Sequence, residues 1–225
     1  MGRDHFPNIP IGAGMGFARG VMLLDDCEGT FTWTVVGTGG DDVHAFATAA
    51  AFQGTYGLQL KTRTTAAAED DYVQITRSMS YPESGLLVFR LRLLSPDISL
   101  CKAITIQLGI SDGVNNYLAS IVLRPSTPAA GYGNVLNAFV AFATAVCPVM
   151  DAQWLTLELV FDTLAHNYIE AYVNGYREDL AGVPVYAAGA DADRRSYAVV
   201  MVDAAGAAAA EIYVDNIYVG EYLES

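Results

Sequence analysis

The clearest periodic pattern in the chain lies in residues 154–175. Over residues 154–161 one side of the segment is apolar at every second position, which is the period of a half-buried β-strand. A short polar break follows, and the alternation returns over residues 168–173. Asn174-Gly175 then favours a two-residue hairpin turn, because both central residues of that turn adopt positive φ. The segment is predicted to form strands that end in a tight turn.

The same period of two recurs along the rest of the chain. Further strands are predicted over residues 21–24, 31–36, 43–48, 56–63, 71–77, 85–94, 103–110, 117–123, 135–144, 197–202 and 211–222. Residues 125–133 and the stretch rich in Pro, Gly and Ala after Gly175 are predicted to be loops, and residues 203–210 to connect two strands. About a dozen short strands without a convincing amphipathic helix indicate an all-β, antiparallel β-sandwich.

Composition excludes several classes of protein. Of the 225 residues, 52% are hydrophobic and only 16% are charged, which excludes a disordered chain. The net charge of −13 argues against a nucleic-acid binder, because phosphate contacts require clustered Lys and Arg. Solubility is the plainest reason for the acidity, although a calcium-dependent or extracellular protein would have a similar charge.

The cysteines and histidines form no recognisable site. Cys27, Cys101 and Cys147 are widely spaced in apolar surroundings, so buried free thiols are expected. A bridge between Cys101 and Cys147 stays open for a protein that works outside the cell. The three histidines form neither an HExxH motif nor a close pair, which disfavours zinc catalysis.

Residues 1–20 form a separate segment in the sequence. Prolines and glycines interrupt it, so it contains no continuous apolar core of a signal peptide, and no run in the chain is long enough to be a transmembrane helix. We expect an extended N-terminal arm, followed by one domain over residues 21–225. The arm either folds back on its own domain or docks on a neighbouring subunit. Its separated apolar side chains are Phe6, Ile9, Ile11, Met15 and Phe17.

Four motifs in order resemble those of a known fold family. Residues 154–175 resemble the back half of concanavalin A-like (laminin-G-type) jelly rolls, in which a strand with an early Trp leads to a Y-x-N-G turn. Residues 24–29, 54–60 and 213–217 resemble the opening acidic turn, the G-x-x-G-L-x-L strand and the closing Y-x-D-D-I strand of jelly-roll carbohydrate-binding modules. The resemblance implies an antiparallel jelly-roll β-sandwich over most of residues 21–222, and it leaves ligand and activity open.

The same resemblance implies a structural calcium ion. Many jelly rolls of this kind hold one between the opening turn and the closing strand, and the matching positions are Asp26, Glu28 and Asp215, with Asp25 as a spare. Carboxylates from both ends of the chain would supply the oxygen ligands that calcium prefers. The alternative is that these residues form turns and are solvated.

Catalysis is not expected. Glycoside hydrolysis requires two carboxylates flanking the bond, and β-glucanases of this fold carry them in an E-x-D-x-E-type run, which this chain lacks. Glu158 and Glu170 stand alone on their strands and are expected to be solubilising.

Sugar binding without catalysis requires exposed aromatic rings and a few polar groups. Most of the thirteen tyrosines are expected to pack on strands. The ligand-binding candidates are Trp33, Tyr117, Tyr132 and Tyr186, from a wider set that also contains Tyr56, Tyr72, Tyr168 and Tyr172.

Two functions from different classes follow. The first is a lectin-like structural protein that decorates a virion surface, in a phage capsid or tail, and that uses residues 1–20 to bind other copies or other virion proteins. The second is a carbohydrate-binding module or lectin of a secreted system. A glycoside hydrolase ranks third, and neither nucleic acid nor a membrane is expected as a partner.

Overall fold

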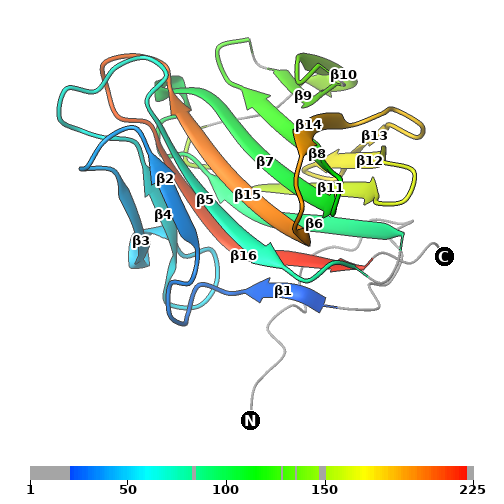
Figure 1. Cartoon of the computed structure of the whole chain (residues 1–225). Helices are drawn as coiled ribbons and strands as arrows, with labels where there is room; N and C mark the ends of the chain where they lie inside the picture. Colours follow the sequence, from blue (N-terminus) through cyan, green and yellow to red (C-terminus); the bar gives the residue numbers. More distant parts are fainter. Residues whose placement is uncertain (1–20, 83–84, 128, 135, 147–150, 222–225) are drawn as a thin grey trace.

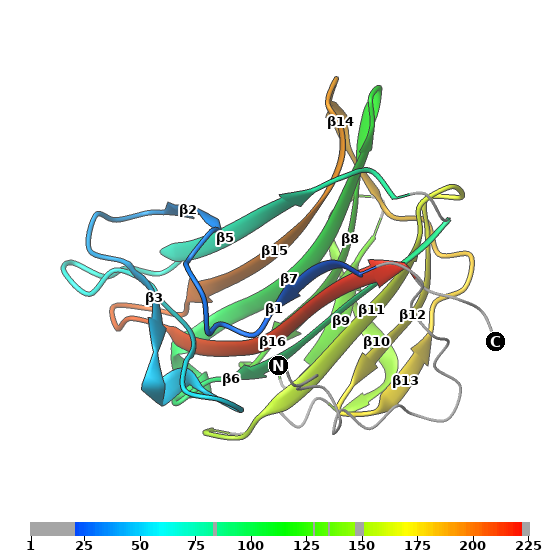
Figure 2. The same ribbon diagram turned by 90° about the horizontal axis from the view of Figure 1, so that it is seen from below.

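The structure is a computed structural model, and it describes residues 21–82, 85–127, 129–134, 136–146 and 151–221. The predicted arm, residues 1–20, and Cys147 lie outside these ranges. The described residues form two antiparallel sheets that pack face to face (Figures 1 and 2). The all-β sandwich predicted from the alternating pattern is confirmed.

Sheet A has the order β13-β12-β11-β6-β16-β4-β3, and β1 also pairs with β16. Its strands are β1 (Val21–Asp25), β3 (Val43–Ala47), β4 (Gly57–Lys61), β6 (Leu86–Leu94), β11 (Leu155–Asp162), β12 (Asn167–Val173), β13 (Tyr176–Asp179) and β16 (Glu211–Glu221).

Sheet B has the order β10-β9-β8-β7-β15-β5-β2, and β14 also pairs with β8. Its strands are β2 (Thr34–Gly37), β5 (Tyr72–Met79), β7 (Cys101–Asp112), β8 (Asn115–Arg124), β9 (Ala129–Gly133), β10 (Phe139–Val146), β14 (Tyr186–Ala190) and β15 (Arg194–Ala204). Two single-turn 3₁₀ helices, η1 (Thr48–Ala50) and η2 (Ile98–Leu100), precede β4 and β7.

The apolar side of each predicted strand faces the other sheet. Leu87, Phe89, Leu91 and Leu93 of β6 have no exposed surface, and the isoleucines of β7 face them from sheet B. Each buried Leu, Ile or Phe contributes about 1.5–3 kcal/mol to folding. One apolar core therefore joins the two sheets.

The turn at Asn174-Gly175 has the predicted geometry. It joins β12 to β13, and Val173 pairs directly with Tyr176 across two intervening residues. The φ angles of Asn174 and Gly175 are 51° and 81°, as a type I′ turn requires. The Asn174 side chain also accepts a hydrogen bond from the Thr156 amide at 2.8 Å, which ties the turn to β11.

The structure contains more strands than the sequence predicted. Residues 125–133 were expected to be a loop and contain β9, and the expected loop after Gly175 contains β13 and β14. Strands β9 and β14 are rich in Ala and Gly, AAGYG and YAAGA, so they show no apolar alternation. The prediction of loops was wrong there because Ala and Gly give no apolar alternation, although hydrogen bonding to β8 holds both segments in sheet B.

Tyr168 links the two sheets through the core. It lies on β12 of sheet A with no exposed surface, and its hydroxyl donates to the Gly133 carbonyl at 2.8 Å. The same oxygen accepts a hydrogen bond from the Ser120 amide of β8 at 2.8 Å. Burial is the main reason that the pKa of this phenol rises to about 12.

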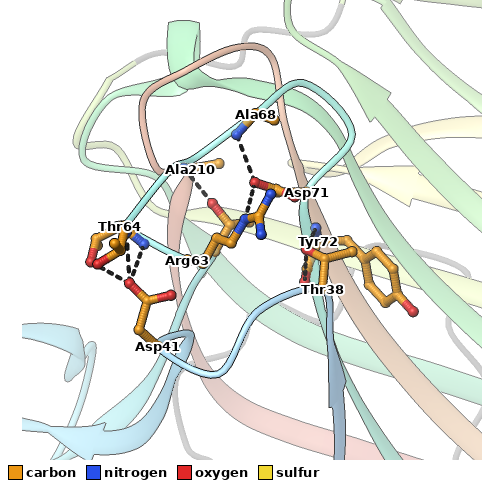
Figure 3. A network of polar contacts seen from close by, with 10 residues as sticks. Thr38, Asp41, Arg63, Thr64, Ala68, Asp71, Tyr72 and Ala210 are labelled. Carbon is orange, nitrogen blue, oxygen red and sulfur yellow. Dashed lines mark hydrogen bonds and ion pairs between the residues drawn. The ribbon is translucent and has the colours of Figure 1, made fainter.

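A polar network closes one end of the sandwich (Figure 3). Arg63 donates to Asp71 at 2.7 Å, and the Asp71 carboxylate also accepts the Ala68 amide. Asp41 accepts hydrogen bonds from the backbone and hydroxyl of Thr64. The loops that follow β2 and β4 are therefore fixed to each other by side chains rather than by sheet pairing.

Candidate functional site

The outer face of sheet B is neutral in its middle and bears aromatic side chains. Strand register places outward side chains in rows that cross the sheet, because directly paired residues point to the same face. Three neighbouring rows contain no charged residue. They are Tyr186-Leu118-Gly109-Tyr197-Ser78, Ser120-Gln107-Val199-Thr76-Thr34 and Val122-Thr105-Met201-Gln74-Val36. We call these fifteen positions the neutral face.

Tyr197 lies flat at the centre of one row. A Cβ atom built on Gly109 would lie 2.2–2.6 Å from three carbons of the Tyr197 ring, so the ring rests directly on the glycine backbone. The Tyr197 hydroxyl donates to Asn116 Oδ1 at 2.8 Å, and the amide of Asn116 lies 2.6 Å from the same hydroxyl. A half-buried ring that rests on the backbone and is held at its hydroxyl is a candidate stacking surface.

The polar side chains around Tyr197 are uncharged amides and hydroxyls. Gln74, Thr76, Thr105 and Gln107 are all half-buried, and Gln74 Nε2 donates to Thr76 Oγ1 at 3.1 Å. Amides and hydroxyls can both donate and accept hydrogen bonds, which suits the hydroxyl groups of a neutral sugar. Ligand-binding sites commonly combine an aromatic surface with a few polar groups of this kind.

Charged residues appear only at the two ends of the neutral face. At one end Arg195 pairs with Asp191 at 3.3 Å, and its guanidinium lies 5.9 Å from the centre of the Tyr197 ring. At the other end Asp203 is paired in register with Tyr72. Burial is the main cause that raises the pKa of Asp203 to about 6, and the negative charge of Asp70 adds to it.

Sheet B projects at one end, as Figure 2 shows. Strands β8 and β14 lie side by side and extend beyond the rest of the sandwich. Tyr186 of β14 is paired with Leu118 of β8. Its row therefore stands at the projecting end of the neutral face.

The structure separates the four predicted aromatic candidates. Trp33 is 5% exposed and its indole N–H donates to Asp25 at 2.7 Å, so it offers no exposed ring. Tyr132 points inward and packs edge-on against Tyr168 in the core. These two positions correct the expectation, because both rings serve the packing of the sandwich.

Tyr117 and Tyr186 lie nearer to the surface. Tyr117 points to the core side of β8, and its ring stacks on His166 with centroids 3.5 Å apart. Tyr186 is half-buried on the neutral face. Of the four candidates only Tyr186 lies on the same face as Tyr197. Tyr197 itself was not among the candidates predicted from the sequence.

Two of the three predicted calcium ligands, Asp26 and Glu28, line a small hollow of about 130 Å³. It is lined by Asp26, Glu28, Gln53, Gly54 and Asn216. Side-chain and backbone oxygens of this kind are suitable calcium ligands. Within the described ranges, however, no three His, Cys, Asp or Glu side chains are grouped closely enough to hold a metal ion. Calcium therefore stays a prediction.

Glu28 and Asp215 have a second role that needs no metal. Asp215 Oδ2 accepts the amides of Phe52 and Gln53 at 2.8 and 3.0 Å, and Glu28 accepts the amides of Thr55 and Tyr56. We call this set of four hydrogen bonds the 52–56 clip. It fastens the segment before β4 to the turn after β1 and to β16. The amide donors also lower the pKa of Glu28.

The carboxylates considered for catalysis are engaged in ion pairs. Glu158 is 1% exposed and pairs with Arg90, and Glu170 pairs with Arg177 at 2.6 Å. Glu69 and Asp70 both bind Lys102. Each of these acids therefore has a cationic partner in the described part of the chain.

Cys27 and Cys101 are buried free thiols, as expected. No helix within the described ranges is long and apolar enough to cross a membrane.

Comparison with known proteins identifies the fold. No protein-family model matches the chain, and no curated protein sequence matches it. A family 11 carbohydrate-binding module from Clostridium thermocellum, solved with a β-1,3-1,4-mixed-linked tetrasaccharide, is 18% identical. The alignment covers 93% of this chain and all of that one, with a TM-score of 0.50.

Two further solved structures are similar. One belongs to a study of carbohydrate-binding modules of the β-sandwich superfamily, at 13% identity and a TM-score of 0.50, and the match covers 94% of this chain and 64% of that chain. The other is an endo-β-1,4-glucuronan lyase from Trichoderma reesei, at 12% identity and a TM-score of 0.49 over 92% and 94% of the two chains. The two matches with a TM-score of 0.50 show that the chain has the jelly-roll β-sandwich fold that its motifs predicted.

Proposed function

We propose that the protein is a non-catalytic carbohydrate-binding module that binds a neutral polysaccharide chain along the neutral face of sheet B. The observation behind this proposal is the flat ring of Tyr197 on Gly109, held by Asn116 and surrounded by amide and hydroxyl side chains. Stacking on the ring would hold a sugar, and the neighbouring Gln and Thr side chains would bind its hydroxyl groups. The carbohydrate-binding modules of the same fold support the choice of ligand class.

The predicted virion role is the less favoured function. It depended on residues 1–20 as an anchor, and those residues lie outside the described ranges. The neutral face instead favours the second of the two expected functions, a module that meets polysaccharides outside the cell.

The proposal can be tested with a panel of soluble neutral polysaccharides that contains mixed-linked β-glucan, xyloglucan, xylan and galactomannan. Binding is measured by affinity electrophoresis and then by calorimetry on any polysaccharide that retards the protein. Tyr197→Ala should weaken binding about tenfold or more, which corresponds to about 1.4 kcal/mol. Tyr176→Ala is the matched control, because Tyr176 is 68% exposed on β13 of sheet A. Absence of binding across the panel, or equal losses in both variants, would refute the proposal.

A further inference from the structure

The outer face of sheet A is buried around two valines, although these side chains point away from the sandwich core. Val88 and Val160 alternate with the core residues Phe89 and Phe161, yet their exposed fractions are only 3% and 0%. They form an apolar cluster of their own, separate from the core, with Leu86, Ile169 and Tyr218 packed around it. The described strands make only two layers, so no third layer of described strands or helices covers this cluster.

A buried carboxylate lies beside this cluster. Glu158 is next but one to Val160 on β11, and its side chain is 1% exposed. One of its oxygens is bound by Arg90, while Oε1 has no hydrogen-bond partner among the described residues. Burial raises the pKa of Glu158. A buried acceptor of this kind calls for a donor from whatever covers the face.

The chain itself enters next to this surface. Strand β1 begins at Val21, which pairs with Gly220 of β16, and Gly220 pairs on its other side with Val88. Twenty residues precede Val21. At about 3.3 Å per residue they can extend roughly 66 Å, several times the distance from β16 to β12 at about 4.8 Å per strand.

The composition of the first twenty residues suits the face. Their separated apolar side chains could cover Val88 and Val160, while Arg3, Arg19 and the backbone amides are donors that could reach Glu158. We propose that residues 1–20 lie across the outer face of sheet A of their own chain. The segment then serves as a cover for this sheet, independent of sugar binding on sheet B.

A cross-linking experiment on the 225-residue chain tests this placement. Benzoylphenylalanine is introduced at Phe17 and activated by light, and the cross-linked peptides are identified by mass spectrometry. The expected products join residue 17 to β6, β11 or β16. A mixture of isotopically heavy and light protein distinguishes residues 1–20 of the same chain from those of a second copy. Products within one isotope class support the proposal, whereas heavy–light products, products on sheet B or no product would overturn it.

Thiol labelling gives a second, independent measurement. Val160→Cys is compared in the full chain and in residues 21–225, with the modification read at that peptide so that native cysteines do not interfere. Removal of the first twenty residues should raise the labelling rate about tenfold or more, because a buried thiol becomes accessible. Thr105→Cys on the neutral face is the control and should react equally in both forms. Equal rates for Val160→Cys in the two folded proteins would overturn the proposal.

Discussion

The ring of Tyr197 lies flat on the backbone of Gly109, its directly paired residue on the neighbouring strand. A glycine in the interior of a strand loses side-chain packing and backbone entropy, so its presence there calls for a reason. The reason here is contact, because any side chain at position 109 would occupy the space of the ring. The orientation of the proposed binding surface therefore depends on two residues that are 88 positions apart in the sequence.

Gly109→Ala should impair sugar binding without unfolding the protein. The new Cβ would meet the Tyr197 ring at 2.2 Å, so the ring must tilt away from the sheet and lose its flat orientation. We expect a loss of affinity comparable to that of Tyr197→Ala, measured by calorimetry on the same polysaccharide. Gly206→Ala is the control, because nothing lies within 4 Å of its Cβ position. Unchanged affinity in Gly109→Ala would show that the flat ring is not required.

Tyr168→Phe should destabilise the sandwich while leaving its shape intact. The substitution removes one hydroxyl and leaves the Ser120 amide and the Gly133 carbonyl without this partner in the buried core. We expect a decrease of about 1–3 kcal/mol in the free energy of unfolding, measured by urea denaturation. Tyr176→Phe on the exposed surface should change the same quantity by less than about 0.5 kcal/mol. Equal effects would mean that the cross-sheet hydrogen bonds contribute little.

Asp203 should make stability depend on pH between about 4 and 6. Its pKa is raised to about 6 in the folded protein, against about 3.9 in an unfolded chain. In this window the folded state binds more protons than the unfolded state, so stability falls as pH rises, and the penalty is complete above the folded pKa.

Asp203→Asn should therefore raise the melting temperature at pH 7.5 and flatten its change between pH 4 and 6. The charged groups that influence Asp203 are Asp70 and Lys102, and both stay in place in this variant. Glu28, Asp41 and Asp71 have lowered pKa values, so their contributions are lost only at lower pH. A pH profile identical to that of the unmodified protein would contradict this role of Asp203.

The sequence was informative wherever large side chains alternate with polar ones. The hairpin at residues 174–175 and the core strands β6 and β7 could be predicted, because Leu, Ile and Phe at every second position fix both the strand and its inner face. Strands β9 and β14 could not, because Ala and Gly give no contrast between the two sides.

The candidate site was harder to predict than the fold. Whether an aromatic ring is a binding surface depends on which side of the strand it occupies and on what lies opposite. Tyr132 stands between Gly131 and Gly133, and only pairing with β8 shows that it faces the core. Gly109 in the interior of a long strand was a usable signal, since it indicates close approach of another group. The identity of that group required the register with β15.

Asp215→Asn should weaken the 52–56 clip. Asp215 is fully buried, and its two oxygens accept three backbone amides from Phe52, Gln53 and Asn216. An asparagine keeps the shape but offers one oxygen and an NH₂ group, so at least one amide loses its acceptor. We expect a loss of about 1.5–3 kcal/mol in the free energy of unfolding, as for hydrogen bonds to a charged group. Hydrogen exchange should also become faster at residues 52 and 53. Unchanged exchange there would rule out the clip.

Calcium binding in the hollow at Asp26 and Glu28 would make the melting temperature depend on calcium, whereas the hydrogen bonds of the 52–56 clip alone would not. Added calcium chloride should raise the melting temperature and a chelator should lower it, because a ligand that binds only the folded state stabilises that state. Asp26→Asn should remove this response, since it deletes one carboxylate of the hollow while the four amide bonds of the clip remain. Magnesium chloride at the same ionic strength is the control for general screening of a chain with a net charge of −13. If the melting temperature is indifferent to both calcium and chelator, Glu28 acts only through the amides of Thr55 and Tyr56.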